Sequence, residues 1–138
     1  MTNPFDAWNQ PIVDEFRANR GTVQRFGRSL VLLHHVGAKS GAARVSPVMG
    51  IHSDPDTWLV AASKAGAPEN PAWFHNLLAH PDVEIETPDD GTVPVRAERL
   101  HGEARDDAWA LFTAKSPGFM QYEQRTARTI PVIALHRR

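Results

Sequence analysis

The stretch VSPVMGIHSDPDTWLVAAS, residues 45–63, consists of two apolar segments on either side of the turn sequence SDPD. Asp and Ser side chains bond to nearby backbone groups and proline fixes φ, so this composition favours a tight turn. We therefore predict that Val45–His52 and Thr57–Ser63 are the two strands of a hairpin. Strands joined by a short turn pair antiparallel, which argues against the parallel sheet of a doubly wound fold.

Further strands flank this hairpin. Ser29–Val36 (SLVLLHHV) is a short apolar run typical of a mostly buried strand. Val83–Thr87 and Thr92–Leu100 predict a second hairpin around the sequence PDDG, and Ile130–Leu135 predicts a last strand. The pattern therefore predicts about six strands, most of them in hairpins.

The N-terminal segment has the spacing of an amphipathic helix. Phe5, Trp8, Ile12 and Phe16 are three or four residues apart, as side chains on one helix face must be. A proline in a helix interior removes a hydrogen bond and clashes with the preceding turn. We therefore expect Pro11 to lie near the first turn of this helix. The apolar stripe is expected to pack against the barrel; contact with a membrane that holds lipid quinones is the alternative.

Three later segments also predict helices. Asn70 and Pro71 are the residue types of an N-cap and a first helical position, and this helix should stop before Pro81. Asp106–Lys115 forms the next helix, and a short one follows residues 117–118. We expect a β-rich α+β fold, a small closed or split β-barrel with about six mainly antiparallel strands and three or four flanking helices.

Length and composition place the chain among globular proteins. Its 138 residues fit one domain, with residues 1–27 as a helical segment and residues 28–138 as the barrel. The 15 basic and 16 acidic side chains give a net charge of -1, which argues against a nucleic-acid-binding protein. There is no cysteine, hence no disulfide, thiolate metal site or cysteine nucleophile. The longest strictly apolar run, Leu30–Leu33, is too short to span a bilayer, and no signal peptide is visible, so the expected location is cytoplasmic.

Charge is unevenly distributed along the chain. No acidic residue occurs from Phe16 to Ser53, a stretch that contains Arg17, Arg20, Arg25, Arg28, Lys39 and Arg44. Such a run is either a solvated face or a local anion site, and only convergence of the cations in space makes it the latter.

The predicted hairpin brings several cations to one end of the barrel. With its turn near Pro55, Lys64 lies within a residue or two of Ser46 and Arg44 across the ladder, and Lys39 is on the loop that leads to the same end. The helix after Asn70-Pro71 begins a few residues later, and a helix N-terminus carries partial positive charge and unsatisfied N–H donors. The sequence therefore favours an anion site at this mouth.

Small residues lie beside the expected anion site. Short side chains let a flat ligand approach the backbone, and Trp73 could form an aromatic wall. The alternative is that the alanines relieve crowding on a curved barrel and that Trp73 belongs to the core. The small residues are Ala61, Ala62, Ala65, Gly66 and Ala67.

The seven histidines do not have the spacing of a metal site. His34 and His35 are neighbours on a strand and point to opposite faces. His75 and His80 are five residues apart, a poor match to the one-turn spacing of zinc ligands on a helix. We expect no metal, and we interpret His75 as a structural residue.

Four motifs in order resemble the deazaflavin (coenzyme F-420)-dependent nitroreductase and quinone reductase family of actinobacteria. They are GAKSG with Arg44, ASKAGAP at residues 62–68, NPAWFHNL at 70–77, and PGFMQY at 117–122 with RTIPV at 128–132. The resemblance covers roughly residues 28–135. Two positions depart from the family, which usually has Arg where this chain has Ala38 and Gly where it has Ala65.

The resemblance implies a split β-barrel of the flavin-binding type and a specific cofactor. That cofactor is coenzyme F-420, an 8-hydroxy-5-deazaflavin with a phosphate and an oligoglutamate tail; flavin mononucleotide is the runner-up. The family reduces quinones and, in some members, nitroaromatic compounds by hydride transfer. The implied cofactor-binding residues are Lys39, Ser40, Arg44, Val48, Ala61, Ala62, Lys64, Gly66, Ala67, Trp73 and Asn76.

Two hydroxyl side chains are candidates for the chemical step. Hydride addition to a quinone or nitro group leaves an oxyanion that needs a hydrogen bond or a proton. We expect the Tyr122 hydroxyl to donate this hydrogen bond or proton, with Ser63 as a second hydrogen-bond donor. The sequence thus predicts a deazaflavin-dependent reductase with a small-molecule acceptor. The alternative is a non-catalytic module that binds a deazaflavin, flavin mononucleotide or haem.

Overall fold

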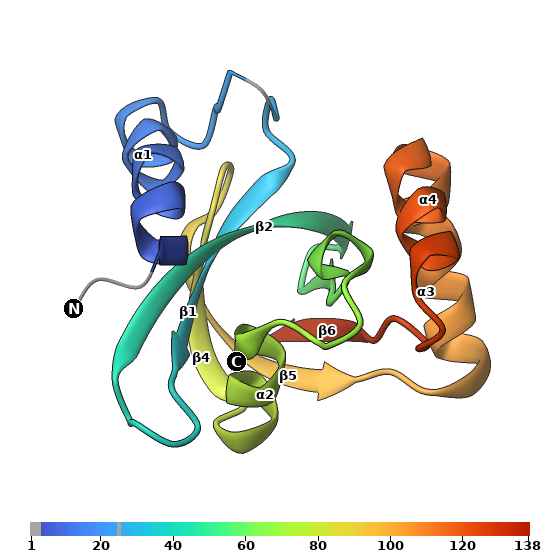
Figure 1. Ribbon diagram of the computed structural model, residues 1–138. Coiled ribbons are helices and arrows are strands. Elements are labelled where there is room, and N and C mark those ends of the chain that lie inside the picture. The colour runs from blue at the N-terminus through green and yellow to red at the C-terminus, as the bar shows by residue number, and fades with distance from the viewer. Residues whose placement is uncertain (1–3, 25) are drawn as a thin grey trace.

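Six strands form a closed barrel in the computed structural model of the chain, which describes residues 4–24 and 26–138, with no side-chain description at residues 4–8 and 65 (Figure 1). The order around the barrel is β1-β2-β3-β6-β5-β4, and every neighbouring pair is antiparallel. The predicted fold class is therefore confirmed. The strands are β1 (Leu30–Val36), β2 (Ala43–Asp54), β3 (Thr57–Ala61), β4 (Asp82–Thr87), β5 (Gly91–Arg99) and β6 (Val132–Arg137).

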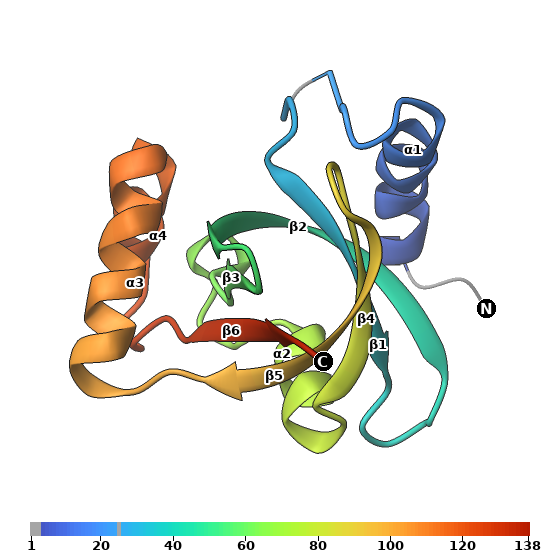
Figure 2. The ribbon, with the colours of Figure 1, turned by 180° about the vertical axis from the view of Figure 1, so that it is seen from behind.

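Within residues 4–24 and 26–138, four α-helices and one 3₁₀ turn surround the barrel. In Figures 1 and 2, α1 lies on one side of the barrel, α3 and α4 lie together on the opposite side, and α2 lies near one end. The elements are α1 (Pro4–Ala18), η1 (Lys64–Gly66), α2 (Ala72–Ala79), α3 (Gly102–Lys115) and α4 (Pro117–Arg125). No helix in the described ranges is long and apolar enough to cross a membrane.

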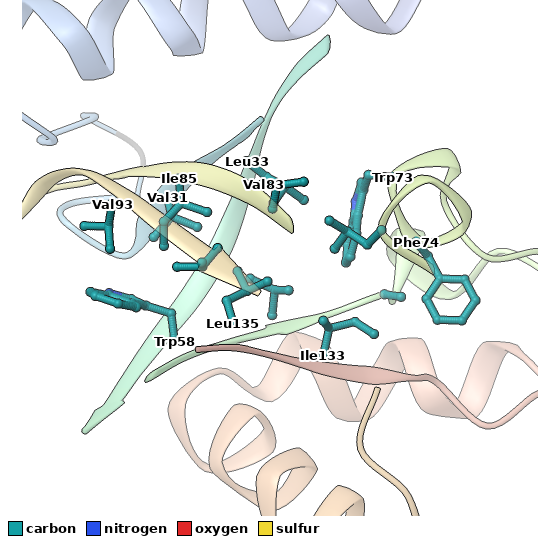
Figure 3. Close-up of a cluster of buried hydrophobic side chains, with 14 residues drawn as sticks. Val31, Leu33, Trp58, Trp73, Phe74, Val83, Ile85, Val93, Ile133 and Leu135 are labelled. Carbon is teal, nitrogen blue, oxygen red and sulfur yellow. The ribbon is translucent and has the colours of Figure 1, made fainter. Parts of the chain in front are cut away.

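The barrel interior is filled by branched and aromatic side chains. Figure 3 shows alternate strand residues such as Val31, Leu33 and Ile85 pointing into one cluster, as the two-residue period of a strand requires. Trp73 and Phe74 of α2 join this cluster from the end of the barrel. The start of α2 is therefore fixed by the barrel core.

Strand β1 is apolar on both faces because helix α1 covers its outer face. Leu30 and Leu32 pack with Val13 and Phe16 of α1, while Val31 and Leu33 face the interior. Phe16 is thus packed on the barrel as expected, whereas the side chains of Phe5 and Trp8 lie outside the described residues. An analogous cluster joins α3 and α4 to β3 and β6.

An ion-pair network also fixes α1 on the barrel. Arg17 of α1 donates two hydrogen bonds to Glu86 of β4, at 3.1 and 2.7 Å, and His34 Nε2 lies 2.7 Å from the same carboxylate. The hydrogen bonds from Arg17 and His34 outweigh partial burial and lower the pKa of Glu86. His34 therefore points to the outer face, opposite to His35, as predicted.

Two predictions about helix starts are wrong. Pro11 lies in the interior of α1, because the helix begins at Pro4; the packing of Val13 and Phe16 against β1 offsets the lost backbone hydrogen bond. Helix α2 has Pro71 rather than Asn70 at its N-cap. The reason for the second difference is a long-range contact of Asn70 with Arg128, described below.

Strand β2 is longer than its β3 partner, so part of one edge of β2 has no strand beside it. Residues Ala43–Met49 pair with β1, whereas β3 pairs only with residues from Gly50 to Asp54. Pro47 lies in the segment with the unpaired edge, where the missing N–H of a proline is tolerated. This free edge of β2 borders the cavity described next.

Candidate functional site

A cavity of about 1060 Å³ lies beside the free edge of β2. Its walls come from α1, β2, α2, α4 and the segment around η1, and Figure 1 shows α1 and α4 on opposite sides of β2. The volume is at the upper end of the range of small-molecule sites, about 300–1,000 Å³. Most of the expected site residues line it: Lys39, Ser40, Arg44, Val48, Ala61, Ser63, Lys64, Trp73, Asn76 and Tyr122.

Three cations line this cavity. Lys39 is exposed on the loop between β1 and β2, where the hydroxyl of Ser40 accepts a 3.2 Å hydrogen bond from the Ala42 N–H. Arg44 lies opposite His35 in the β1–β2 ladder, and Lys64 opens the η1 turn. Pro71 and Ala72, at the start of α2, line the cavity as well. The three predicted cations and the start of α2 therefore line the same cavity.

Lys64 has a carboxylate partner that the sequence analysis did not include. Its Nζ lies 2.8 Å from Oε1 of the exposed Glu69. The hydrogen bond and charge of Lys64 lower the pKa of Glu69. The two residues are only five positions apart in the sequence. The turn at Lys64, with φ of 45°, brings their side chains together.

Arg128 holds the segment that carries Ser63 and Lys64. Its guanidinium donates to the carbonyls of Ala62, Ser63 and Ala67 at 3.1, 2.8 and 3.0 Å, and to Oδ1 of Asn70 at 2.7 Å. Partial burial lowers its pKa. One side chain thus binds both ends of the segment from residue 62 to residue 70, of which Ser63 and Lys64 line the cavity.

Three of the expected cofactor-binding residues lie outside the cavity lining. Ala62 is fully buried, and its N–H donates to the Pro131 carbonyl at 2.9 Å. Gly66 has φ of +81°, and a Cβ there would come within 2.8 Å of the Tyr122 carbonyl oxygen. The carbonyl of Ala67 is bound by Arg128. These small residues let α4 and Arg128 approach the chain, whereas Ala61 does line the cavity.

Two hydroxyl side chains line the wall near α4. The Tyr122 ring stands edge-on to the buried Phe119 ring, with 5.7 Å between centroids and an interplanar angle of 81°. Ser63 precedes the η1 turn, and its hydroxyl makes no capping hydrogen bond. Both residues belong to the cavity lining.

A buried polar network that the sequence analysis missed lies at the other wall. His35, only 4% exposed, has Nε2 2.8 Å from the hydroxyl of Ser46 and Nδ1 2.9 Å from Nδ2 of Asn76. The other amide atom of Asn76, Oδ1, accepts a 2.9 Å hydrogen bond from the Ala38 N–H. His35, Ser46 and Asn76 all line the cavity. No local sequence signal joins them, because they come from β1, β2 and α2.

Comparison with known families identifies the family of the chain. A family model described as F420H(2)-dependent quinone reductase matches residues 8–137. The chain belongs to this family. The resemblance noted from the sequence is thereby confirmed, and so is coenzyme F-420 as the family's cofactor.

Individual relatives agree with this assignment. An F420H(2)-dependent quinone reductase of Mycobacterium tuberculosis is 35% identical over 127 residues, covering 86% of this chain and 85% of the relative. The solved structure of an F420-H2 dependent reductase, FDR-A, superimposes with a TM-score of 0.70 at 34% identity, covering 79% of this chain and 95% of that one. A third relative, solved as a domain-swapped dimer, superimposes with a TM-score of 0.73 at 31% identity. The match covers 97% of this chain and 100% of that one. The protein is accordingly an F-420-dependent oxidoreductase.

Proposed function

We propose that this protein transfers hydride from reduced coenzyme F-420 to a quinone, with nitroaromatic compounds as a second class of acceptor. The observation that carries the proposal is the cavity itself. It combines three cations, an apolar wall and two hydroxyl side chains in a chain of the F420H(2)-dependent quinone reductase family.

The residues present fit an anionic, flat cofactor. Lys39, Arg44 and Lys64 are suited to the phosphate and the tail carboxylates, because charge-assisted hydrogen bonds to such oxygens are the strong ones. Trp73 and Ala61 offer a flat wall for a ring system. A cavity of about 1060 Å³ has room for a tricyclic ring with a side chain.

The bound coenzyme would supply a hydride, so the task of the protein is to orient the acceptor and stabilise the charge that develops on it. The buried Phe119 ring packs edge-on against the Tyr122 ring and excludes water from that side of it. The Tyr122 hydroxyl donates a hydrogen bond to the acceptor oxygen that gains negative charge, and then a proton. Ser63 donates the second hydrogen bond.

The position of α1 bears on how an acceptor reaches the site. Asn9 and Ile12 of α1 line the cavity opposite α4, so a quinone would enter between these helices. A cytoplasmic location with contact between α1 and a quinone-bearing membrane is part of this proposal. Sedimentation of the protein with vesicles of neutral lipid tests that contact directly.

The catalytic proposal is tested by the oxidation of reduced coenzyme F-420, followed by its absorbance with and without acceptor. We expect oxidation that requires both the protein and a quinone, and a slower reaction with a nitroaromatic acceptor. Tight binding of the coenzyme without acceptor-dependent oxidation by either class would contradict catalysis. It would instead favour the alternative, a non-catalytic binding module.

A further inference from the structure

The network of His35, Asn76 and Ser46 has a fixed direction because it begins at a backbone amide. The Ala38 N–H can only donate, so the Asn76 atom 2.9 Å from it must be the oxygen. The other amide atom of Asn76 is then the NH₂ group, which donates to Nδ1 of His35 at 2.9 Å. A flipped amide would place two donors against each other at Ala38.

This direction sets the tautomer of His35. Nδ1 accepts a hydrogen bond, so it carries no proton, and the proton of the neutral ring is on Nε2. Nε2–H then donates to the hydroxyl oxygen of Ser46 at 2.8 Å. The hydroxyl proton of Ser46 has to point elsewhere, since its oxygen already accepts from His35.

The position of Ser46 in the cavity lining puts its hydroxyl within reach of a bound ligand. Ser46 lines the cavity, and Arg44, two residues earlier on β2, is on the same strand face. A donor beside a cation suits an anionic oxygen. We propose that His35, as its Nε2–H tautomer, is a positioning residue that makes Ser46 a hydrogen-bond donor to an anionic oxygen of the bound ligand.

The ligand in this proposal is the coenzyme, so this part rests on the proposed function. The relay also gives Ala38 a role, although its side chain replaces the arginine that is usual in the family. Its backbone N–H, on the loop that carries Lys39, starts the hydrogen-bond chain that ends at Ser46. The loop and the middle of β2 are thereby coupled through α2.

The first test uses the free protein and needs no coenzyme. Long-range ¹H–¹⁵N correlation spectra report which ring nitrogen of a histidine is protonated. At neutral pH we expect His35 to have protonated Nε2 and unprotonated Nδ1. A proton on Nδ1, alone or together with Nε2, overturns the relay.

The second test is a double-mutant cycle on the affinity for oxidised coenzyme F-420, measured by its fluorescence. Ser46→Ala should weaken binding by about tenfold, the effect of one hydrogen bond to a charged group. An asparagine at residue 35 reaches the Nδ1 position but not Nε2, so His35→Asn should cause the same loss. The double variant should be no weaker than either single variant.

Two further variants separate the relay from a general effect on structure. A glutamine reaches the Nε2 position, so His35→Gln should restore most of the affinity that His35→Asn loses. Ser53→Ala, on the same strand but outside the cavity lining, should leave binding unchanged. Additive losses in the cycle, or equal losses in the Asn and Gln variants, overturn the proposal. Failure of the wild type to bind the coenzyme, together with an Nε2–H tautomer, would instead overturn the proposed function.

Discussion

The guanidinium of Arg128 donates a 2.7 Å hydrogen bond to the side-chain oxygen of Asn70, 58 residues away in the chain. Asn70 uses its side-chain oxygen for this contact, and Pro71 occupies the N-cap position of α2 without a side-chain capping bond. The same guanidinium binds three carbonyls of the segment that carries Lys64. One charged side chain thus decides the shape of a cavity wall.

Replacement of Arg128 should therefore affect both stability and ligand binding. Arg128→Lys removes most of the fixed geometry of these hydrogen bonds and should destabilise the protein by about 2–3 kcal/mol. Urea unfolding measures this change, and coenzyme affinity should fall with it. Arg96→Lys is the matched control, because Arg96 makes an exposed ion pair with Asp82 and its loss should cost no more than about 0.5 kcal/mol. Equal effects of the two substitutions would contradict the role of Arg128.

Glu69 should compete with an anionic ligand for Lys64, because the two form an ion pair at the cavity mouth. Glu69→Gln removes the competing charge and should tighten coenzyme binding by about two- to fivefold. Lys64→Ala should weaken it by at least about tenfold. Fluorescence titration gives both values, with the distant Glu103→Gln as control. Unchanged affinity in the Lys64 variant would remove this residue from the anion site.

Tyr122→Phe should lower turnover with little change in coenzyme affinity. The substitution keeps the edge-on contact with Phe119 and removes only the hydroxyl. We expect a loss of about 10²-fold or more in kcat with a quinone acceptor. Steady-state kinetics together with a binding titration separate the two effects. Full turnover in this variant would show that another group donates the proton.

Gly66 should be intolerant of a side chain because α4 packs against it. Gly66→Ala places a Cβ 2.8 Å from the Tyr122 carbonyl oxygen, whereas Gly91, with φ of +66°, has no atom within 4 Å of such a Cβ. Both substitutions strain a left-handed backbone, so Gly91→Ala measures that cost alone. We expect Gly66→Ala to be less stable than Gly91→Ala by about 1–3 kcal/mol in thermal unfolding. Equal stability would mean that α4 is not held against η1.

The contribution of Glu86 to stability should depend on pH in a defined direction. Its pKa is lower in the folded protein than the ordinary value of 4.5, chiefly because Arg17 donates hydrogen bonds to the carboxylate. Folding therefore favours the ionised form, and the stabilisation is present above pH 4.5 and lost as pH falls through the lower, folded value. At neutral pH the free energy of unfolding of the wild type should exceed that of Glu86→Gln by about 1 kcal/mol. The difference is this small because Arg17 is partly exposed and solvent screens its charge. The difference should shrink in acid, as pH-dependent urea unfolding measures; a difference that grows in acid would contradict it.

Features set by local residues could be predicted from the sequence. The turn composition of SDPD at residues 53–56 predicted the hairpin. The predicted ladder between Lys64 and Arg44 is wrong, because β3 ends at Ala61 and Lys64 belongs to the η1 turn, although both residues line the cavity. The six strand-like segments, most of them in hairpins, predicted the barrel. Helix boundaries were predicted wrongly where tertiary packing overrides local propensity. Pro11 lies inside α1 because neighbouring residues of that helix pack on β1.

Features that depend on distant contacts could not be predicted. The His35–Asn76 pair spans 41 residues, and nothing in either local sequence indicates the other. Gly66 appeared suited to a ligand because it is small, yet the structure shows that α4 occupies the adjacent space. Both cases concern tertiary neighbours, which single-sequence patterns do not specify.

The central claim is that the cavity beside β2 binds coenzyme F-420 through its cations. The most direct measurement is a fluorescence titration of the protein with oxidised coenzyme F-420 and, in parallel, with flavin mononucleotide, at low and high salt. The account predicts that the deazaflavin binds more tightly and that its binding weakens as salt rises. Tighter binding of flavin mononucleotide, or no binding of either ligand, would contradict it.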